Sequence, residues 1–524
     1  MAQSPAATQT VRPRGERFAL NVLWSWTGVA ASVFSGFVIT PMVIRKLGPE
    51  HYGIWLQVFS ILEYFAFFDL GFNPAIVNFC ARFLAVKDDQ KINQVLNTAL
   101  FYFSMIALAV WVTVPVLALR ATEFFKVSEA DRHEFRTLIL ITGLSWGLQM
   151  TLHIFLSALD GFQRFDLTSR VMVLQVALRA AGYFLALEMG YGLVAMAQIY
   201  IGTQLMGYAL NFLNFRRVFP QLRLGPRYVS RQMFGDILRY GLKSFVANSS
   251  TLALSQSGVL TVGHYLGETA VGFFGLPSRM LQQVTDVVSR IGMVVRSSAA
   301  ELTATSKREE TISLGVYANR YSLTLFMPLA VFLLVYGRPL LIRWVHNPEM
   351  VTQSAPLLPI FLLSYSLVLA AQFSSSSLLY GLGRHGGYAR GLVVEAVAYV
   401  TALLWVVPRY GIMGAAWTSA LLMIAVRGLY TPWLVARALD YSYLAYMRRI
   451  YVRPLAAGVP AALTAWALRT VIPGATWFQL AAAGAVTATV YGAVALFLCL
   501  TPWHRSLLFS RIPLIGPYFQ VSRA

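Results

Sequence analysis

Long apolar segments follow one another along almost the whole chain, and each has about the length of a membrane span. A helix needs roughly 20 apolar residues to cross a bilayer, and it satisfies its own backbone hydrogen bonds in lipid. Of the 524 residues, 57% are hydrophobic and only 12% are charged. A soluble chain carries about twice that share of charge. The sequence therefore predicts an all-α polytopic membrane protein.

About fourteen transmembrane helices can be drawn from these segments. The hydrophilic segment 1–18 precedes the first of them, which is too long for the core of a signal peptide and is expected to remain as a membrane helix. The expected spans have the approximate limits 19–42, 52–72, 94–118, 137–158, 171–189, 193–214, 239–263, 268–295, 316–337, 355–380, 391–407, 412–436, 454–472 and 477–500.

Two short motifs recur at one fixed distance. Leu47-Gly48-x4-Gly53 returns as Leu266-Gly267-x4-Gly272, and a Tyr-Gly pair at 191–192 returns at 410–411, in both cases 219 residues further on. This offset contains six of the expected helices, an even number, so both copies enter the membrane in the same direction. We therefore expect two six-helix lobes related by a pseudo-two-fold axis along the membrane normal.

The duplication divides the chain into segments. Helices 13 and 14 fall outside it. The expected segments are a cytoplasmic N-terminal segment 1–18, an N-lobe 19–214, a cytoplasmic connection 215–238, a C-lobe 239–436, the last two helices 437–500 and a cytoplasmic tail 501–524.

The basic residues predict the orientation. With both termini in the cytoplasm, 29 of the 42 Lys and Arg residues lie in or beside cytoplasmic segments, as the positive-inside rule requires. This topology and attraction to anionic lipid account for the net charge of +20. Nucleic acid is not an expected partner, because the basic residues lack interleaved aromatic side chains. The two cysteines, Cys80 and Cys499, lie in or beside apolar segments and indicate neither a disulfide framework nor a metal site.

Several of these segments are similar to a known family. The segment Leu-Gly-Pro-Glu-His-Tyr-Gly-Ile-Trp at 47–55, the Phe-Asp-Leu-Gly at 68–71 and the Pro-Ser-Arg-Met-Leu-Gln at 277–282 resemble Wzx-type polysaccharide flippases. These belong to the multidrug/oligosaccharidyl-lipid/polysaccharide (MOP) exporter superfamily. The resemblance implies a central cavity that opens alternately to each side of a bacterial inner membrane. It also implies a lipid-linked oligosaccharide as cargo, with a polysaccharide polymerase and other assembly proteins as further partners.

The eighth expected helix carries a polar stripe. Arg279, Gln282, Gln283, Asp286 and Arg290 recur at helical spacing on one face, and the other face is aliphatic. A charged residue in the bilayer centre is costly, by about 2.5–3.5 kcal/mol on insertion scales. The stripe should therefore face protein or water instead of lipid.

Arg279 is the residue of this stripe expected near the middle of the bilayer. Its planar guanidinium suits a polyprenyl pyrophosphate, because it donates paired hydrogen bonds and stays charged when desolvated. The alternative is structural, with Arg279 paired to Asp286 or Glu63. We favour the binding role for Arg279 and the structural role for Arg290, which lies nearer the cytoplasmic end.

The seventh expected helix is unusually polar. Lys243, Ser250, Ser257 and His264 follow at seven-residue steps. Side chains of this kind fit a wet cavity that handles sugars, and they are also common where membrane helices pack together. The sequence leaves both interpretations open.

Four acids fall within expected spans and are candidates for ion coupling or for charge pairing: Glu63, Asp69, Asp286 and Glu395. Buried carboxylates readily carry a proton during transport. An alternative interpretation of Asp69 is that it is a cap residue, because Gly71 and Pro74 follow it and can end or kink the helix.

Neither a catalytic residue nor a cofactor is expected. The chain has no Gly-x4-Gly-Lys-Ser/Thr phosphate loop, so an ion gradient, the membrane potential or removal of product would drive transport. A cation-coupled multidrug exporter of the same superfamily is the nearer alternative, although its cavity would favour acids. An integral-membrane glycosyltransferase, polymerase or acyltransferase is the other, and it would need a catalytic acid or His on a sizeable loop. The longest expected external loops, 119–136 and 338–354, contain no convincing cluster of acids or histidines, although His346 and Glu349 lie three residues apart.

Overall fold

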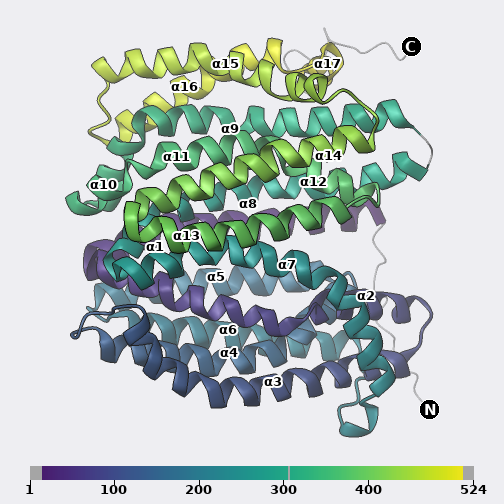
Figure 1. The fold of residues 1–524 in the computed structure, drawn as a ribbon. Helices are drawn as coiled ribbons and strands as arrows, with labels where there is room; N and C mark the ends of the chain where they lie inside the picture. Colours follow the sequence, from purple (N-terminus) through teal and green to yellow (C-terminus); the bar gives the residue numbers. More distant parts are fainter. Residues whose placement is uncertain (1–13, 305–306, 511–524) are drawn as a thin grey trace, which may run out of the picture. The chain divides into compact units, whose positions relative to one another are not determined.

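The computed structural model describes residues 14–304 and 307–510, and within these ranges it contains helices and no strand (Figure 1). The side chains of residues 14–30, 243–244, 367, 369–371 and 507–510, and of most of 283–304, are outside the description. The long helices are α1 (Arg14–Tyr64), α2 (Phe72–Ala85), α3 (Asp89–Phe124), α4 (Arg132–Gly161), α5 (Phe165–Glu188), α6 (Leu193–Val218), α7 (Arg231–Leu266), α8 (Glu268–Ala304), α9 (Arg308–Val345), α12 (Ala371–Gly381), α13 (Gly386–Met423), α15 (Tyr443–Val471) and α16 (Trp477–Leu498). The shorter elements are η1 (Phe65–Asp69), η2 (Pro226–Tyr228), α10 (Pro348–Ser354), α11 (Leu357–Ser364), η3 (Tyr365–Ala370), η4 (Ile424–Tyr430), α14 (Thr431–Ala438) and α17 (Pro502–Ser510).

The fold class expected from the sequence is confirmed. Every expected span coincides with a helical segment, and eight helices of the described part are long and apolar enough to cross a membrane. Two of these eight are compound, because α1 and α13 each continue through a break at a glycine. Gly48 has φ 92° and Gly411 has φ 60°, and these conformations favour glycine because they crowd a Cβ atom. The number fourteen stays a prediction.

The expected span 52–72 is helical as far as Asp69 but not α-helical throughout. Helix α1 ends at Tyr64, a 3-10 turn (η1) follows, and α2 begins at Phe72. Gly71 lies between them with φ 79°, in the left-handed region where an α-helix cannot continue. Asp69 is therefore in a turn and not in the middle of a helix.

The chain forms two compact units. The first comprises residues up to Met42, Phe65–Thr122 and Glu129–Phe245, and the second comprises Val43–Tyr64, Glu123–Ser128 and the residues from Val246 onward. This grouping follows spatial contact, whereas the expected lobes 19–214 and 239–436 follow the sequence repeat. The lobe boundaries stay a prediction.

In the first unit, α4 packs against α2, α5 and α6, and Figure 1 shows α3, α4 and α6 running side by side. The core is built from aromatic and aliphatic side chains of α2, α3, α4 and α6 and of the first part of α7, among them Phe72, Phe103, Phe155 and Phe215. Aromatic pairs such as Phe155 with Phe215, whose ring centroids are 5.9 Å apart, add directional packing to dispersion.

The connection expected at 215–238 is partly helical and is held by the first unit. Helix α6 continues to Val218 and α7 already begins at Arg231. Between them, the amide of Asn93 binds the backbone of Gln221 and Arg223, and that of Asn97 binds Arg223 and Gly225, at 2.7–3.1 Å. Asn93 and Asn97 are four residues apart on α3, so they face the same side and fix the connection along that helix.

The second unit is built around α9, which packs against α8, α12, α15 and α16. Figure 1 shows α9 beside α15 and α16. A buried polar group holds these helices together: Asn319 donates to Ser375 Oγ at 2.7 Å and to the Tyr446 hydroxyl at 3.0 Å. Interhelical hydrogen bonds of this kind stabilise helix packing in membranes. Ser375 of α12 thus takes part in helix packing.

The repeated Leu-Gly-x4-Gly motifs meet within the second unit. Gly267 has φ 84° and separates α7 from α8, as Gly48 divides α1. A Cβ atom on Gly53 would collide with the carbonyl of Glu268, and one on Gly272 would crowd the carbonyl of Pro49. The contact is reciprocal, as a local two-fold relation between the two copies of the motif requires.

Candidate functional site

The candidate site lies in the second unit, where the last part of α1 packs against α7 and α8. Glycines allow a close approach, since a Cβ atom on Gly263 would overlap Gln57 and one on Gly275 would overlap Leu56. Gln57 and Ser60 are fully buried here, and their side-chain polar atoms have no hydrogen-bond partner among the described residues. The site therefore combines close packing with unsatisfied polar groups.

Three side chains from three helices form a chain of polar contacts. Gln256 of α7, only 2% exposed, donates from Nε2 to Glu63 Oε2 of α1. Its Oε1 accepts from Arg279 Nη2 of α8 at 3.4 Å. One amide thus bridges an acid and a base, and the charge of Arg279 still acts on the Glu63 carboxylate.

Arg279 keeps most of its donors available. It is half-buried, and within the described side chains its hydrogen bond to Gln256 is the one it makes. A guanidinium has five N–H donors in a planar fork, so this single long bond leaves an unused edge. Of the two structural partners expected from the sequence, Glu63 is reached only through Gln256, and the side chain of Asp286 is outside the described residues.

Polar residues of α7 and α8 extend the site. The hydroxyls of Ser257 and Tyr64 share a hydrogen bond of 2.6 Å, and Gln282 Oε1 accepts from the Tyr365 hydroxyl at 3.3 Å. Ser250 instead donates to the carbonyl of Val246 in its own helix, at 2.9 Å. The structure therefore places Ser257 and Gln282 in contacts between helices, while Ser250 satisfies local backbone.

Of the remaining stripe residues, His264 has its Nδ1 atom 2.6 Å from the carbonyl oxygen of Phe124, and the other four are not described. Lys243, Gln283, Asp286 and Arg290 lie on α7 and α8, and their side chains are outside the described residues. Their roles in cargo binding or charge pairing stay predictions.

Glu395 occupies a different environment. Its Oε2 accepts from Arg427 Nε at 3.0 Å, and the carboxylate side chain is only 2% exposed. Arg427 was not among the sequence candidates, although an arginine inside the expected span 412–436 was the available signal. Glu395 is therefore engaged in a buried ion pair.

Asp69 lies in the first unit and makes the contacts of a cap residue. Its Oδ1 accepts from the backbone and side-chain nitrogens of Asn73 at 3.2 and 2.7 Å, next to the beginning of α2. Asn73 Oδ1 in turn accepts from Ser157 Oγ at 2.9 Å and lies 3.0 Å from His153 Nδ1. The cap alternative for Asp69 agrees with this geometry.

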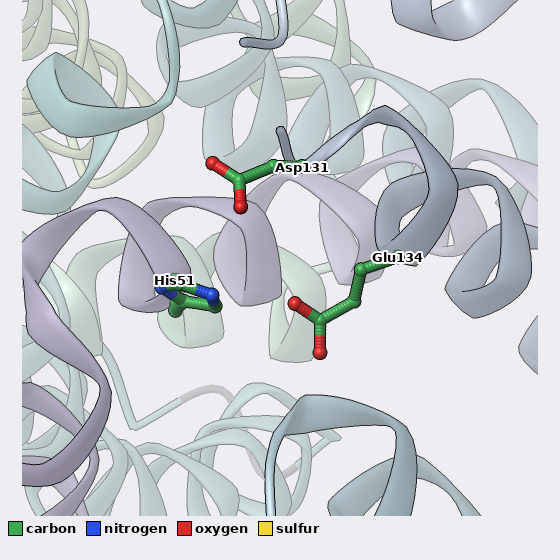
Figure 2. Close-up of side chains that lie close together, drawn as sticks. All are labelled: His51, Asp131 and Glu134. Carbon is green, nitrogen blue, oxygen red and sulfur yellow. The ribbon is translucent and has the colours of Figure 1, made fainter. Parts of the chain in front are cut away.

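Two further acids lie at the beginning of α4. Figure 2 shows the carboxylates of Asp131 and Glu134 at this end of the helix; His51, also drawn there, belongs to the second unit. The N-terminal end of a helix carries a partial positive charge. That charge is a sufficient reason for acids in the first turn.

Solved structures share this fold. The lipid II flippase MurJ in an inward closed conformation matches with a TM-score of 0.72 and 14% identity over 94% of this chain and 100% of that one. An inward-facing multidrug resistance MATE family transporter of the MOP superfamily matches with a TM-score of 0.64 and 13% identity over 81% of this chain and 99% of that one. The chain therefore has the fold seen in transporters of the MOP superfamily.

The sequence comparison is more specific. Residues 18–296, more than half of the 524-residue chain, match the family described as polysaccharide biosynthesis protein, and the chain belongs to that family. The membrane protein EpsK of Bacillus subtilis (strain 168) is 23% identical over 503 residues, which is 94% of this chain and 98% of that protein. The resemblance to polysaccharide flippases noted in the sequence is thus confirmed, and the protein is a multi-pass membrane protein.

Proposed function

We propose that this protein moves a lipid-linked oligosaccharide, joined through a polyprenyl pyrophosphate, from the cytoplasmic to the outer leaflet of a bacterial inner membrane. The family is one of polysaccharide biosynthesis, and the fold is shared with a lipid II flippase. The observation that carries the proposal is the state of Arg279. Its guanidinium is half-buried and makes one long hydrogen bond to a described side chain. Its other N–H groups can therefore donate to a diphosphate.

The polar residues around Arg279 support the same cargo. Gln256 holds the guanidinium at one edge, so the other edge can donate paired hydrogen bonds to phosphate oxygens. Hydroxyl and amide groups at Ser257 and Gln282 can exchange their present contacts for sugar hydroxyls. Glu63 competes with the cargo for the positive charge of Arg279, which would promote release.

Alternating access would follow from the duplicated architecture. In this proposal the lobes 19–214 and 239–436 rock about the cargo, the polyprenyl tail stays in lipid, and both chain termini remain in the cytoplasm. A polysaccharide polymerase would receive the product on the outer side. The fold is shared with a flippase and a transporter, so we assign a transport role and not a catalytic one.

The decisive experiment is transport by purified protein in liposomes. The probe is a fluorescent polyprenyl-pyrophosphate disaccharide, and the readout is the exposure of its sugar to a glycosidase added outside. Arg279→Ala should lower the rate at least about a hundredfold, because an anionic head group would lose its guanidinium in a site of low polarity. Arg279→Lys should retain part of the rate, since it keeps the charge without the planar fork.

The matched control is Arg409→Ala. Arg409 is an exposed arginine of α13 that stacks on Trp405, so its loss removes the same charge away from the site and should leave the rate unchanged. Full transport by Arg279→Ala would remove this residue from the site, and equal losses in both variants would attribute the effect to overall charge.

A cation-coupled drug exporter is the second candidate, because the exposed carboxylate of Glu63 lies in the same site and a MATE transporter shares the fold. The same liposomes, loaded with a fluorescent cationic dye, test it. Dye efflux that needs Glu63 but not Arg279 would favour this alternative.

A further inference from the structure

A buried arginine lies apart from the candidate site, on α9 of the second unit. Arg320 is 3% exposed, and its Nε and Nη2 atoms have no hydrogen-bond acceptor among the described residues. Its guanidinium carbon lies 4.8 Å from the ring centroid of Tyr317 and 5.5 Å from that of Tyr321. Aromatic faces attract the cation but offer no acceptor for its N–H groups, so a ligand that supplies oxygen atoms would satisfy them.

An open pocket of about 460 Å³ lies close to this arginine. Tyr317 forms one wall, Arg453 of α15 and Arg505 of α17 supply positive charge, and the end of α16 closes the rest. The lining residues include no acid. Two guanidinium groups in one pocket repel each other unless an anion lies between them.

Two neighbours connect Arg320 to the pocket. Tyr317 belongs both to the pocket wall and to the aromatic surface under the guanidinium. Cys499, fully buried between two pocket-lining leucines, is acted on electrostatically by Arg320 and Arg453 together. Arg320 therefore adds a third positive charge next to Tyr317, a residue of the pocket wall.

His504 of α17 does not add a further charge. Burial, and to a smaller extent the positive charge of Arg320, lower its pKa below the usual 6.5, so the imidazole is neutral at pH 7. Its Nδ1 lies 2.9 Å from the Tyr321 hydroxyl. The positive charge of this region thus comes from arginines, which stay charged at every physiological pH.

The pocket lies at the end of an apolar helix, where lipid head groups are expected. The apolar helix α16 ends at Leu498, which lines the pocket, and Trp503 beside it is 59% exposed. Exposed tryptophans are enriched at the boundary between lipid tails and head groups. We propose that Arg320, Arg453 and Arg505 form a binding site for a phosphate ester, supplied by the head group of an anionic phospholipid.

Native mass spectrometry of the full chain in neutral detergent tests this site. Phosphatidylglycerol should bind more tightly than zwitterionic phosphatidylcholine, and the double variant Arg453→Gln with Arg505→Gln should lower its affinity about tenfold or more. The control is Arg448→Gln with Arg449→Gln, two exposed arginines of α15 that do not line the pocket, and it should bind as the parent does. Equal losses in the two double variants, or no loss in the first, would overturn the proposal.

Competition with inorganic phosphate identifies the source of the ligand. Bound phosphatidylglycerol that resists millimolar phosphate assigns the site to lipid. Displacement by phosphate assigns it to a soluble phosphate ester, and the recognised chemistry is the same.

The role of Arg320 is tested by thermal unfolding with and without phosphatidylglycerol. The lipid should raise the Tm of the parent but not that of Arg320→Gln, and without lipid the variant should be at least as stable as the parent, because it lacks an unsatisfied charge. A purely structural arginine would instead give a variant that is less stable in both conditions, which would contradict the assignment. If Arg320→Gln cannot be purified, the double variant of Arg453 and Arg505 decides alone.

Discussion

Two arginines of the second unit lie within expected membrane spans and contact acids in different ways. Arg427 contacts Glu395 directly at 3.0 Å, and both side chains are largely buried. Arg279 reaches Glu63 only through the amide of Gln256, and Glu63 is exposed. In a direct buried pair the two charges neutralise each other and stabilise the fold. In a bridged pair the amide keeps the opposite charges apart, so N–H donors of the arginine stay available for a ligand. The contacts of an arginine inside an apolar span thus decide whether it is a candidate for ligand binding or a structural residue.

The largest effect is expected from breaking the direct pair. Arg427→Met leaves the carboxylate of Glu395 buried without its partner, and such changes typically cost about 3–5 kcal/mol. The free energy of unfolding in detergent measures this loss. Adding Glu395→Leu to the same chain should recover most of it, because an apolar pair replaces the buried charges.

The control for this prediction is Arg409→Met on α13, the helix that carries Glu395. Arg409 is exposed and stacks on Trp405 at 4.5 Å, so its loss should cost less than about 1 kcal/mol. A stable Arg427→Met variant, or a double variant no better than the single one, would show that the two regions do not differ as described.

The fold was largely predictable from the sequence, because apolar spans and glycine positions act locally. Gly48 and Gly267 are separated by the same 219 residues as the two Tyr-Gly pairs, which predicted a duplication. Both glycines have a positive φ at a helix break. The change from α-helix to 3-10 helix near the end of the span 52–72 was not predicted. Gly71 was recognised as a possible break, but periodicity alone does not tell whether a glycine is tolerated inside a helix or ends it.

The site was less predictable, because its contacts join residues far apart in the sequence. Arg279, Glu63 and Gln256 could each be named from their positions in spans, but the bridge between them links residues 193 positions apart. The partner of Glu395 was missed for the same reason, since Arg427 lies on the next expected span. Arg320, at the beginning of an apolar stretch, gave no signal that its guanidinium lacks an acceptor.

A smaller effect is expected from removing the bridge. Gln256→Leu keeps the approximate volume but removes the donor to Glu63 and the acceptor for Arg279. The loss should be about 1–3 kcal/mol, the cost of leaving buried polar groups unsatisfied, measured by unfolding in detergent. Transport should fall as well, because Arg279 would no longer be held in one orientation. Unchanged stability and transport would mean that the bridge does not position the guanidinium.

The smallest effect on stability is expected at Glu63, and the same substitution in the two regions makes the contrast direct. Glu63→Gln should change the free energy of unfolding by less than about 1 kcal/mol, because the side chain is exposed and an amide still accepts from Gln256. Glu395→Gln should cost more, since it leaves Arg427 buried beside a neutral group.

The affinity for pyrophosphate should also distinguish Glu63 from Glu395. Without the Glu63 carboxylate, no carboxylate among the described side chains contacts the site of Arg279, so the affinity for inorganic pyrophosphate should rise about fivefold, a change of about 1 kcal/mol. Isothermal titration with the purified protein measures it, and Glu395→Gln is the control that should leave this affinity unchanged. If both variants bind pyrophosphate as the parent does, the carboxylate does not compete for Arg279. If both bind it more tightly, a general loss of negative charge is the cause, and the distinction between a bridged and a direct pair has no consequence for cargo.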